Sequence, residues 1–338
     1  MSTVSALSPE ILRLDPVKET EQIVDGIRDL VFRQLKRKGA VVGVSGGIDS
    51  AVVAFLCTRA LGRERVLALF TPEADSSEDS LRLGRRVAES LGIHWALEDI
   101  SAVLRAAGCY ERRDEAIRKS VPDYGPGYKS KIVLPSLPDG SRYSLFSVIV
   151  QSPARETRKV RLNPGAYLGI VAATNFKQRT RKMMEYYYAD LLQYAVAGTP
   201  NRLEYDQGFF VKNGDGAADF KPIAHLYKSQ VYQLAAWLGV PEEIQRRPPT
   251  TDTYSLEQSQ EEFYFSLPLD RMDLCLYGRN HAIPAAALAP IVNLDEEQVE
   301  RVYAIIESKR AAARYLRSAP LLVKEVEGIT DDPCVGSY

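Results

Sequence analysis

The sequence predicts an α/β fold in which a doubly wound parallel sheet is flanked by helices. Short apolar runs rich in β-branched residues recur between residues 40 and 97, and amphipathic stretches separate them. Strands that alternate with helices form parallel sheets, because each helix returns the chain to the same end of the sheet. A long helical pattern at 295–316 further predicts a mostly helical C-terminal part.

The first predicted element is an amphipathic helix from about Pro16 to Lys38, closed by Gly39. The elements that follow are, in chain order, a strand at 40–44, a helix from 48 to about 61, a strand at 66–70, a helix at 76–91 and a strand at 94–97. Periods of two and 3.6 residues distinguish these strands from the helices. Together they predict strand, helix and strand in repeated order.

The chain changes character between about 109 and 165, where turn-forming Gly and Pro cluster. Within this stretch the runs 131–134 and 143–150 are typical of two strands of a β-hairpin. Its solvated face is predicted to carry Arg155, Arg158, Lys159 and Arg161. We therefore expect this stretch to be an insertion that serves as a lid or an interface element.

Regular structure resumes after the insertion. The expected elements are a helix at 175–192 with the buried aromatic run Tyr186, Tyr187 and Tyr188, a strand at 195–197, a helix at 223–238 and a last long helix at 295–316. Gly239 and Pro241 stop the third of these.

Composition excludes several classes of protein. The 338 residues include 43 Lys and Arg against 44 Asp and Glu, a balance that argues against coating nucleic acid or an anionic membrane. The sequence has no export signal pattern at its N-terminus and no run of about 18 apolar residues. The four cysteines, Cys57, Cys109, Cys275 and Cys334, are far apart and suggest neither disulfides nor zinc. We therefore expect a cytoplasmic protein that acts on small molecules.

The strongest local signal is the run Ser-Gly-Gly-Ile-Asp-Ser at 45–50, directly after a predicted strand. Adjacent glycines let backbone N–H groups converge on an anion, and the next helix points its positive end at the same place. Asp49 is a hard oxygen ligand suited to Mg²⁺. The pattern predicts a phosphate site, although Asp and Ser could instead serve only as helix caps.

Two other phosphate loops do not fit. The dipeptide Gly-Lys of the Walker pattern occurs nowhere, and Gly43, Gly46 and Gly47 have the wrong spacing for a dinucleotide fingerprint. Simple NTPases and hydride-transfer enzymes are therefore excluded.

The loop at 45–50 resembles that of the ATP-pyrophosphatase (PP-loop) group, whose members cleave ATP between its α and β phosphates. Further segments are similar to the NAD synthetase family: Gly198-Thr-Pro-Asn-Arg-Leu-Glu204, the run 208–219 with Gly214-Asp-Gly216, and Pro222 to Lys228. Asn175 with Arg179 and Arg181, the run 249–252, and Lys309-Arg310 also match. The resemblance covers about residues 17–323 apart from the insertion, and it implies a single domain that spans 1–338 and has an adenine nucleotide alpha-hydrolase-like fold.

The resemblance also implies site roles. ATP phosphates would be held by Gly43, Val44, Ser45, Gly46, Gly47, Ile48, Asp49 and Ser50, with Thr199, Lys228 and Thr250 also contacting ATP. Deamido-NAD would meet Arg179, Lys212, Asp219 and Lys309. Mg²⁺ would bind Asp49 and Glu204, and Ser45, Asp49 and Lys228 would serve catalysis. Of Arg179 and Arg181 we favour Arg179, because residues i and i+2 lie about 200° apart on a helix.

The implied reaction is ammonia-dependent synthesis of NAD, in which ATP adenylates the nicotinate carboxylate of deamido-NAD and ammonia displaces AMP. Only about 40 residues precede the first strand, too few for a glutaminase domain. We expect free ammonia, or ammonia delivered by a separate glutaminase chain. The family resemblance also implies a homodimer.

Two alternatives remain open. Pro200 replaces a usual Gly, and Ser308 a usual His, which leaves room for an amide-forming ligase that acts on another carboxylate. An inactive ATP-binding sensor is the alternative of another class, but retention of both predicted metal ligands argues against it.

Overall fold

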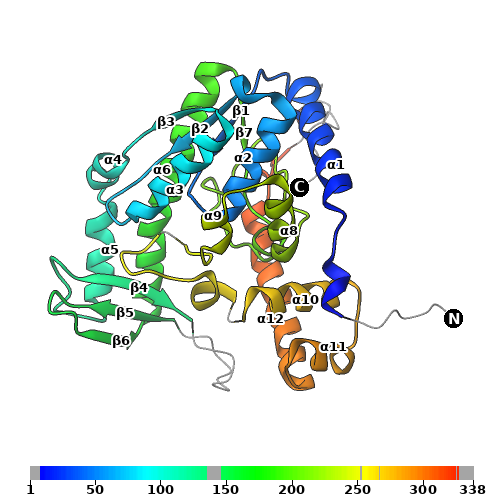
Figure 1. Ribbon diagram of the computed structural model, residues 1–338. Coiled ribbons are helices and arrows are strands. Elements are labelled where there is room, and N and C mark those ends of the chain that lie inside the picture. Colours follow the sequence, from blue (N-terminus) through cyan, green and yellow to red (C-terminus); the bar gives the residue numbers. More distant parts are fainter. Residues whose placement is uncertain (1–7, 135–145, 252, 266, 325, 327–338) are drawn as a thin grey trace.

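The computed structural model describes residues 8–134, 146–251, 253–265, 267–324 and 326. Its central sheet has four parallel strands in the order β3-β2-β1-β7 (Figure 1). The strands are β1 (Ala40–Gly43), β2 (Val66–Phe70), β3 (His94–Leu97) and β7 (Ala195–Ala197). The predicted parallel sheet is confirmed, and the bounds of its last three strands match the predicted ones.

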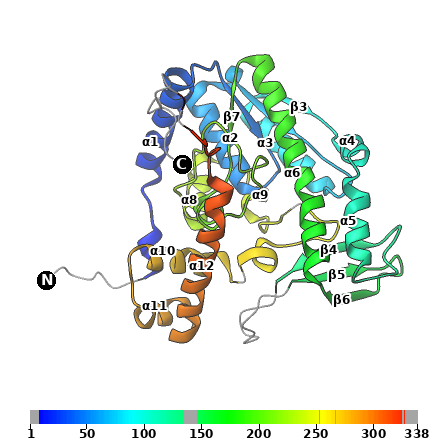
Figure 2. The same ribbon diagram turned by 180° about the vertical axis from the view of Figure 1, so that it is seen from behind.

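Helices cover both faces of this sheet, which is why it is doubly wound. Side chains alternate along β1, so Val42 packs on one face and Val41 on the other. The face of Val42 is covered by α1 (Pro16–Arg28), α2 (Ile48–Leu61), α3 (Glu78–Leu91) and α8 (Lys228–Leu238). The face of Val41 is covered by α6 (Pro164–Leu192), which lies across the sheet in Figure 2.

The strand order places a binding crevice beside β1. The chain passes from β1 through α2 to β2 on one side, whereas β7 arrives through α6 on the other side. Ligands of open α/β sheets bind outside the carboxyl ends of the strands where the order reverses in this way. In this molecule the loop after β1 occupies that point.

The inserted region differs from the expected hairpin. It forms a three-stranded antiparallel sheet of β4 (Lys129–Val133), β5 (Ser147–Gln151) and β6 (Thr157–Arg161). The third strand escaped prediction because Val160 is its one apolar residue, so it lacks the alternation that marks a strand. Residues 143–145 of the predicted second strand lie outside the described residues. The helices α4 (Ser101–Ala106) and α5 (Cys109–Arg118) precede this sheet.

Three helices have other limits than predicted. The helix expected to start at 175 begins at Pro164, because the Asn163 side chain caps it and accepts a hydrogen bond from the N–H of Ala166 at 2.8 Å. The helix expected at 223–238 begins at Lys228, after Tyr227 as N-cap.

The first helix continues α1 as a π-helix, Asp29–Gln34, and ends there, four residues before Lys38. Gly39 does not cap it. A Cβ at position 39 would lie 2.3 Å from the Arg65 carbonyl oxygen, so this glycine allows the close approach of another segment.

The C-terminal part is mostly helical, as predicted, and has its own apolar core. Its helices are α10 (Leu269–Asn280), α11 (Ala285–Val292) and α12 (Glu296–Arg317), preceded by a π-helix at Glu261–Phe265. The short helices α7 (Arg202–Gln207) and α9 (Glu242–Arg246) flank α8, and 3-10 turns occur at Pro9–Leu12 and Arg63–Arg65. Across the described ranges, no helix has both the length and the apolar character of a membrane span.

Candidate functional site

The loop after β1 has the geometry of a phosphate cradle. It runs from Gly43 into α2, whose N-cap is Gly47. Gly46 has φ +75°, and a Cβ there would lie 2.5 Å from the Ser80 carbonyl oxygen, so only glycine fits. The two hydroxyl groups of Ser45 and Ser50 lie 3.2 Å apart. The helix N-terminus and these hydroxyls supply donors for an anion.

An ion pair forms the base of the site. Lys228, which opens α8 and is 2% exposed, donates from Nζ to Oδ2 of Asp49. The other carboxylate oxygen of Asp49 accepts from Nδ2 of Asn201 at 3.0 Å. Burial opposes the charge of Lys228, but Asp49 and then Glu204 outweigh it and raise the pKa of this lysine. The side chain therefore carries a permanent positive charge toward the cradle.

Glu204 lies beside this pair on α7. It forms a capping box with Asn201: Glu204 Oε2 accepts from the Asn201 N–H at 3.1 Å, and Asn201 Oδ1 accepts from the Glu204 N–H at 3.3 Å. Its Oε1 accepts from Nε2 of Gln260 at 2.9 Å. Burial and the negative charge of Asp49 raise the pKa of Glu204 to about 8. A cation between the two carboxylates would relieve this repulsion.

These acceptors fit a metal that is shared with a substrate. Among the residues that the structure describes, no three His, Cys, Asp or Glu side chains could hold a metal ion by themselves. Mg²⁺ commonly uses only one or two carboxylates and takes its other ligands from water and substrate phosphates. The pair Asp49 and Glu204 next to a phosphate cradle matches this donor set.

One cavity of about 750 Å³ joins the predicted ATP and acceptor residues. Of the residues predicted from the sequence, those that line it are Gly43, Val44, Ser45, Gly47, Ile48, Asp49, Ser50, Thr199, Glu204, Lys228, Thr250, Arg179 and Lys212. Gly46 lies in the same loop and shapes its turn. The structure thus brings together residues that are up to 207 positions apart in the chain, from Gly43 to Thr250.

The acceptor side is formed by two cations. The Nε of Arg179 donates to the Lys212 carbonyl at 3.2 Å. The Nζ of Lys212 donates to the Tyr315 carbonyl at 2.8 Å and lies 4.3 Å from the Tyr315 ring centroid. Arg181 also lines the cavity, so the expectation that only one of the two arginines would face the site is wrong. A long side chain can reach around the helix, and the Nε of Arg181 donates to the Thr71 carbonyl at 3.3 Å.

Two predicted acceptor residues lie elsewhere. Asp219 does not line the cavity: it accepts hydrogen bonds from the Val196 N–H at 2.7 Å and the Tyr186 hydroxyl at 3.2 Å. Lys309 lies behind the lining residue Tyr264, donates to its carbonyl and stands 4.0 Å from its ring centroid. Burial lowers the pKa of Lys309 to about 7. Both residues support the wall of the cavity from behind.

The predicted burial of the aromatic run on α6 is wrong for Tyr187, which is 57% exposed. Its neighbours Tyr186 and Tyr188 pack in the apolar cluster between the sheet and α6. A helix that covers a sheet has an outer side as well, and Tyr187 lies on it.

Sequence reasoning assigned no role to three residues that line or support the site. Arg247 lines the cavity and donates from Nη1 to the Gly46 carbonyl at 3.4 Å and from Nη2 to the Ser80 hydroxyl at 3.0 Å. Asn201 links the two acidic residues, as described above. Asp273, fully buried, accepts from the N–H groups of Lys228 at 3.1 Å and Ser229 at 2.7 Å, which fixes the start of α8. The capping-box spacing of Asn201 and Glu204 was the one available signal.

Comparison with known proteins adds the family. The sequence profile described as NAD synthase matches residues 19–120 and 151–315. The NH(3)-dependent NAD(+) synthetase of Rhizobium meliloti (strain 1021) is 59% identical over 322 residues, which is 95% of this chain and 96% of the relative. The protein of the same name from Mesorhizobium japonicum is 60% identical over 316 residues, 94% of this chain and 99% of the relative.

Solved structures agree on the fold. The NH3-dependent NAD synthetase of Campylobacter jejuni has a TM-score of 0.60 at 23% identity, covering 92% of this chain and 100% of that one. The NMN synthetase of Francisella tularensis has a TM-score of 0.60 at 21% identity, covering 92% and 99%. With the profile match and the relatives above, this chain belongs to the NAD synthase family.

Proposed function

We propose that this protein is an ammonia-dependent NAD synthetase that uses ATP to convert the nicotinate carboxylate of deamido-NAD into an amide. The observation that carries the proposal is a single cavity in which a phosphate cradle with the Asp49–Lys228 pair faces the cations Arg179 and Lys212. Two anionic substrates can be held there next to each other. The NH(3)-dependent NAD(+) synthetases at 59% and 60% identity support the same reaction.

The cradle holds the phosphates of ATP. Backbone N–H groups at the start of α2, the Ser45 and Ser50 hydroxyls and Lys228 converge on the same region, with Thr199 and Thr250 on neighbouring walls. Asp49 and Glu204 would hold Mg²⁺, which when bound neutralises charge on the phosphates. The protein itself is asked for positioning and charge stabilisation rather than covalent chemistry.

In the first step a carboxylate oxygen of the nicotinate attacks the α-phosphorus of ATP, and the bond to the β-phosphate oxygen breaks. Pyrophosphate leaves with the bonding electron pair, and Lys228 and Arg247 stabilise its charge. Arg179 and Lys212 orient the acceptor from the opposite side. In the second step ammonia attacks the acyl carbon and AMP leaves, which yields the amide of NAD and one proton. Closure of the cavity walls over the bound adenylate would exclude water, which would otherwise hydrolyse it.

Asp219 and Lys309 act from behind the wall. Asp219 ties the end of β7 to α6, and Lys309 holds the backbone of Tyr264. In the single chain, we assign both residues to shaping the acceptor side of the cavity and not to contacting the acceptor itself.

We further propose a homodimer that forms through the outer side of α6. Met183, Tyr187 and Leu191 occur at every fourth position and are 53%, 57% and 63% exposed, so they form one apolar stripe. The same helix carries Arg179 and Arg181 into the cavity. Replacing Tyr187 and Leu191 with Glu should yield monomers in analytical ultracentrifugation; a dimer of unchanged affinity would exclude this face.

We also propose that residues 1–338 form one synthetase domain with an inserted sheet, and that it takes up free ammonia in the cytoplasm. Three buried free thiols, Cys57, Cys109 and Cys275, are typical of proteins in a reducing compartment.

The direct test is an assay of the purified protein with ATP, Mg²⁺ and deamido-NAD, with ammonium or glutamine as nitrogen source. We expect NAD with ammonium and little with glutamine. The mononucleotide, nicotinate mononucleotide, is the control acceptor, because an NMN synthetase shares this fold. Amidation of the mononucleotide in preference to deamido-NAD would overturn the assignment.

A further inference from the structure

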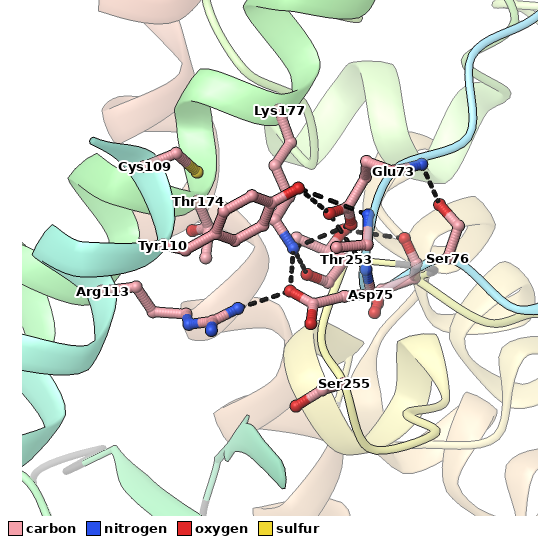
Figure 3. A network of polar contacts seen from close by, with 12 residues as sticks. Glu73, Asp75, Ser76, Cys109, Tyr110, Arg113, Thr174, Lys177, Thr253 and Ser255 are labelled. Atoms are coloured by element: carbon pink, nitrogen blue, oxygen red, sulfur yellow. Dashed lines mark hydrogen bonds and ion pairs between the residues drawn. The ribbon is translucent and has the colours of Figure 1, made fainter. Parts of the chain in front are cut away.

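A buried ionic network lies behind one wall of the cavity, and Lys177 of α6 is its centre (Figure 3). Lys177 is 0% exposed, and its Nζ donates to Glu73 Oε1 at 2.9 Å, to Asp75 Oδ2 at 2.6 Å and to the Thr253 carbonyl at 2.7 Å. An ammonium group has three donors, so all of them are used. The lysine therefore joins α6 to the loop after β2 and to the segment around Thr253.

The helix α5 closes the network from the other side. The Tyr110 hydroxyl donates to Glu73 Oε2 at 2.8 Å, and Arg113 donates from Nη1 to Asp75 Oδ2. Burial and then Glu73 raise the pKa of Tyr110, so it stays a donor. The side chain of Glu73 is 0% exposed, and those of Asp75 and Arg113 are 12% and 11% exposed. The two acids Glu73 and Asp75 thus face the two bases Lys177 and Arg113, and a third acid, Asp114, whose side chain is 27% exposed, accepts from Arg113 Nε at 2.8 Å at the edge of the network.

The loop that these acids anchor forms a wall of the site. Thr71, Pro72 and Ser76 of this loop line the cavity, and so does Thr253. The Ser76 hydroxyl accepts from the Glu73 N–H at 3.2 Å and lies 3.4 Å from Nη2 of Arg181. None of the four charged residues in the network lines the cavity itself. They hold the wall without touching its contents.

This wall stands next to the phosphate cradle. It follows β2, the neighbour of β1, and the N–H of Val44 at the start of the cradle donates to the Leu69 carbonyl of β2 at 3.0 Å. The acceptor cations are held from elsewhere: Lys212 donates to the Tyr315 and Ser318 carbonyls at the end of α12, and Arg179 donates to the Lys212 carbonyl. The network thus adjoins the ATP side of the cavity.

Stability alone does not explain such an arrangement. Burying four charged groups costs desolvation, and apolar residues of equal volume often stabilise a protein as well or better. A saturated set of charged hydrogen bonds, in contrast, fixes one geometry. We propose that Lys177, with Glu73, Asp75, Tyr110 and Arg113, are positioning residues that preform the wall of the ATP subsite and couple it to α5. The proposal rests on ATP binding in the cradle, as proposed above.

The test compares two Tyr→Phe variants that each remove one hydroxyl donor to a glutamate. Tyr110→Phe removes the bond to Glu73, whereas Tyr188→Phe removes a bond of 2.6 Å to Glu98, and neither Tyr188 nor Glu98 lines the cavity. We expect Tyr110→Phe to raise the KM for ATP about tenfold, with kcat and the KM for deamido-NAD changed by less than about twofold. Tyr188→Phe should lower the melting temperature by about as much as Tyr110→Phe does, but it should leave all three constants within about twofold of the parent.

A second variant probes the centre of the network. Lys177→Met alone leaves two buried acids with one base, so it is combined with Glu73→Gln to keep the charge balanced. The double variant Lys177→Met/Glu73→Gln should fold, and its KM for ATP should exceed that of the parent by more than about tenfold. Calorimetric binding of ATP with Mg²⁺, measured without acceptor, should weaken in parallel. This readout stays valid even if the parent uses another acceptor, and absence of ATP binding to the parent would instead refute the proposed function.

Unchanged ATP affinity in folded Tyr110→Phe and in the folded double variant would overturn the proposal, because the network would then only stabilise the fold. A fall in kcat with an unchanged KM for ATP would overturn it equally.

Discussion

The ion pair of Lys228 and Asp49 allows stability and catalysis to be separated. Lys228 is 2% exposed and faces two carboxylates, so Lys228→Met leaves Asp49 and Glu204 without their base. Removing one partner of a buried ion pair costs about 3–5 kcal/mol. Asp49→Asn is milder, because Lys228 retains Glu204, and we expect a loss of about 1–3 kcal/mol.

The double variant Asp49→Asn/Lys228→Met completes a double-mutant cycle with the two single variants and decides whether the two side chains are coupled. With both charges removed, the cost should be smaller than the sum of the single costs by about 1–3 kcal/mol, the coupling typical of residues in contact. Activity should not recover in parallel. All three variants should lose at least about 10²-fold in kcat, because the proposed mechanism uses Lys228 to stabilise charge in the transition state and Asp49 to bind Mg²⁺.

The assay pairs urea unfolding, followed by circular dichroism, with pyrophosphate release in the presence of ATP, Mg²⁺, deamido-NAD and ammonium. The reasoning fails if the single costs simply add, since the two side chains would then not be coupled. It fails as well if Asp49→Asn keeps near-parental turnover, because the proposed metal role would be wrong.

Three further predictions concern single positions. Gly46→Ala should lose ATP binding and about 1–3 kcal/mol or more of stability, because φ at this position is +75° and the new Cβ would lie 2.5 Å from the Ser80 carbonyl oxygen. The control Gly92→Ala, with φ +61° and open space around the position, should cost only about 1–2 kcal/mol and retain activity. Equal behaviour of the two variants would refute the steric argument. Arg247→Met should raise the KM for ATP about tenfold, whereas Arg246→Met, on an exposed residue that pairs with Glu242, should not; equal KM values would remove Arg247 from the site. Lys309→Met should be more stable than the parent below pH 7, and this difference in stability should shrink as the pH rises to 10.5. Burial lowers the pKa of Lys309 from 10.5 to about 7, so between these pH values the unfolded parent binds more protons than the folded parent. A difference in melting temperature that does not change with pH would contradict this prediction.

The elements with strong periodicity were predictable from the sequence. The strands β2, β3 and β7 are short apolar runs bounded by turns, and the structure has them at the predicted residues. The cradle was predictable as well, because Gly46 and Gly47 lie between a strand and a helix in one short run. Local signals of this kind depend on neighbours along the chain.

What escaped prediction depends on contacts between distant segments. Lys177 and Glu73 are 104 positions apart, Asn201 and Asp49 are 152 apart, and Arg247 and Gly46 are 201 apart. No local pattern marks such a partner. The strand β6 was missed for another reason, since its polar side chains are exposed and only its backbone pairs with β5.

The resemblance to a family guided the acceptor side less well than the ATP side. Asp219 and Lys309 match family positions, yet in this structure both lie behind the wall. Motif register places a residue in a segment, but packing decides whether its side chain reaches the cavity.

The most direct test of the central claim follows an oxygen atom. Deamido-NAD labelled with ¹⁸O in the nicotinate carboxylate is converted in unlabelled water with ATP, Mg²⁺ and ammonium, and the AMP is analysed by mass spectrometry. If the carboxylate attacks the α-phosphorus and ammonia then displaces AMP, one labelled oxygen is carried into the phosphate of AMP for each NAD formed. Formation of NAD with unlabelled AMP, or no NAD from folded protein, would contradict the account.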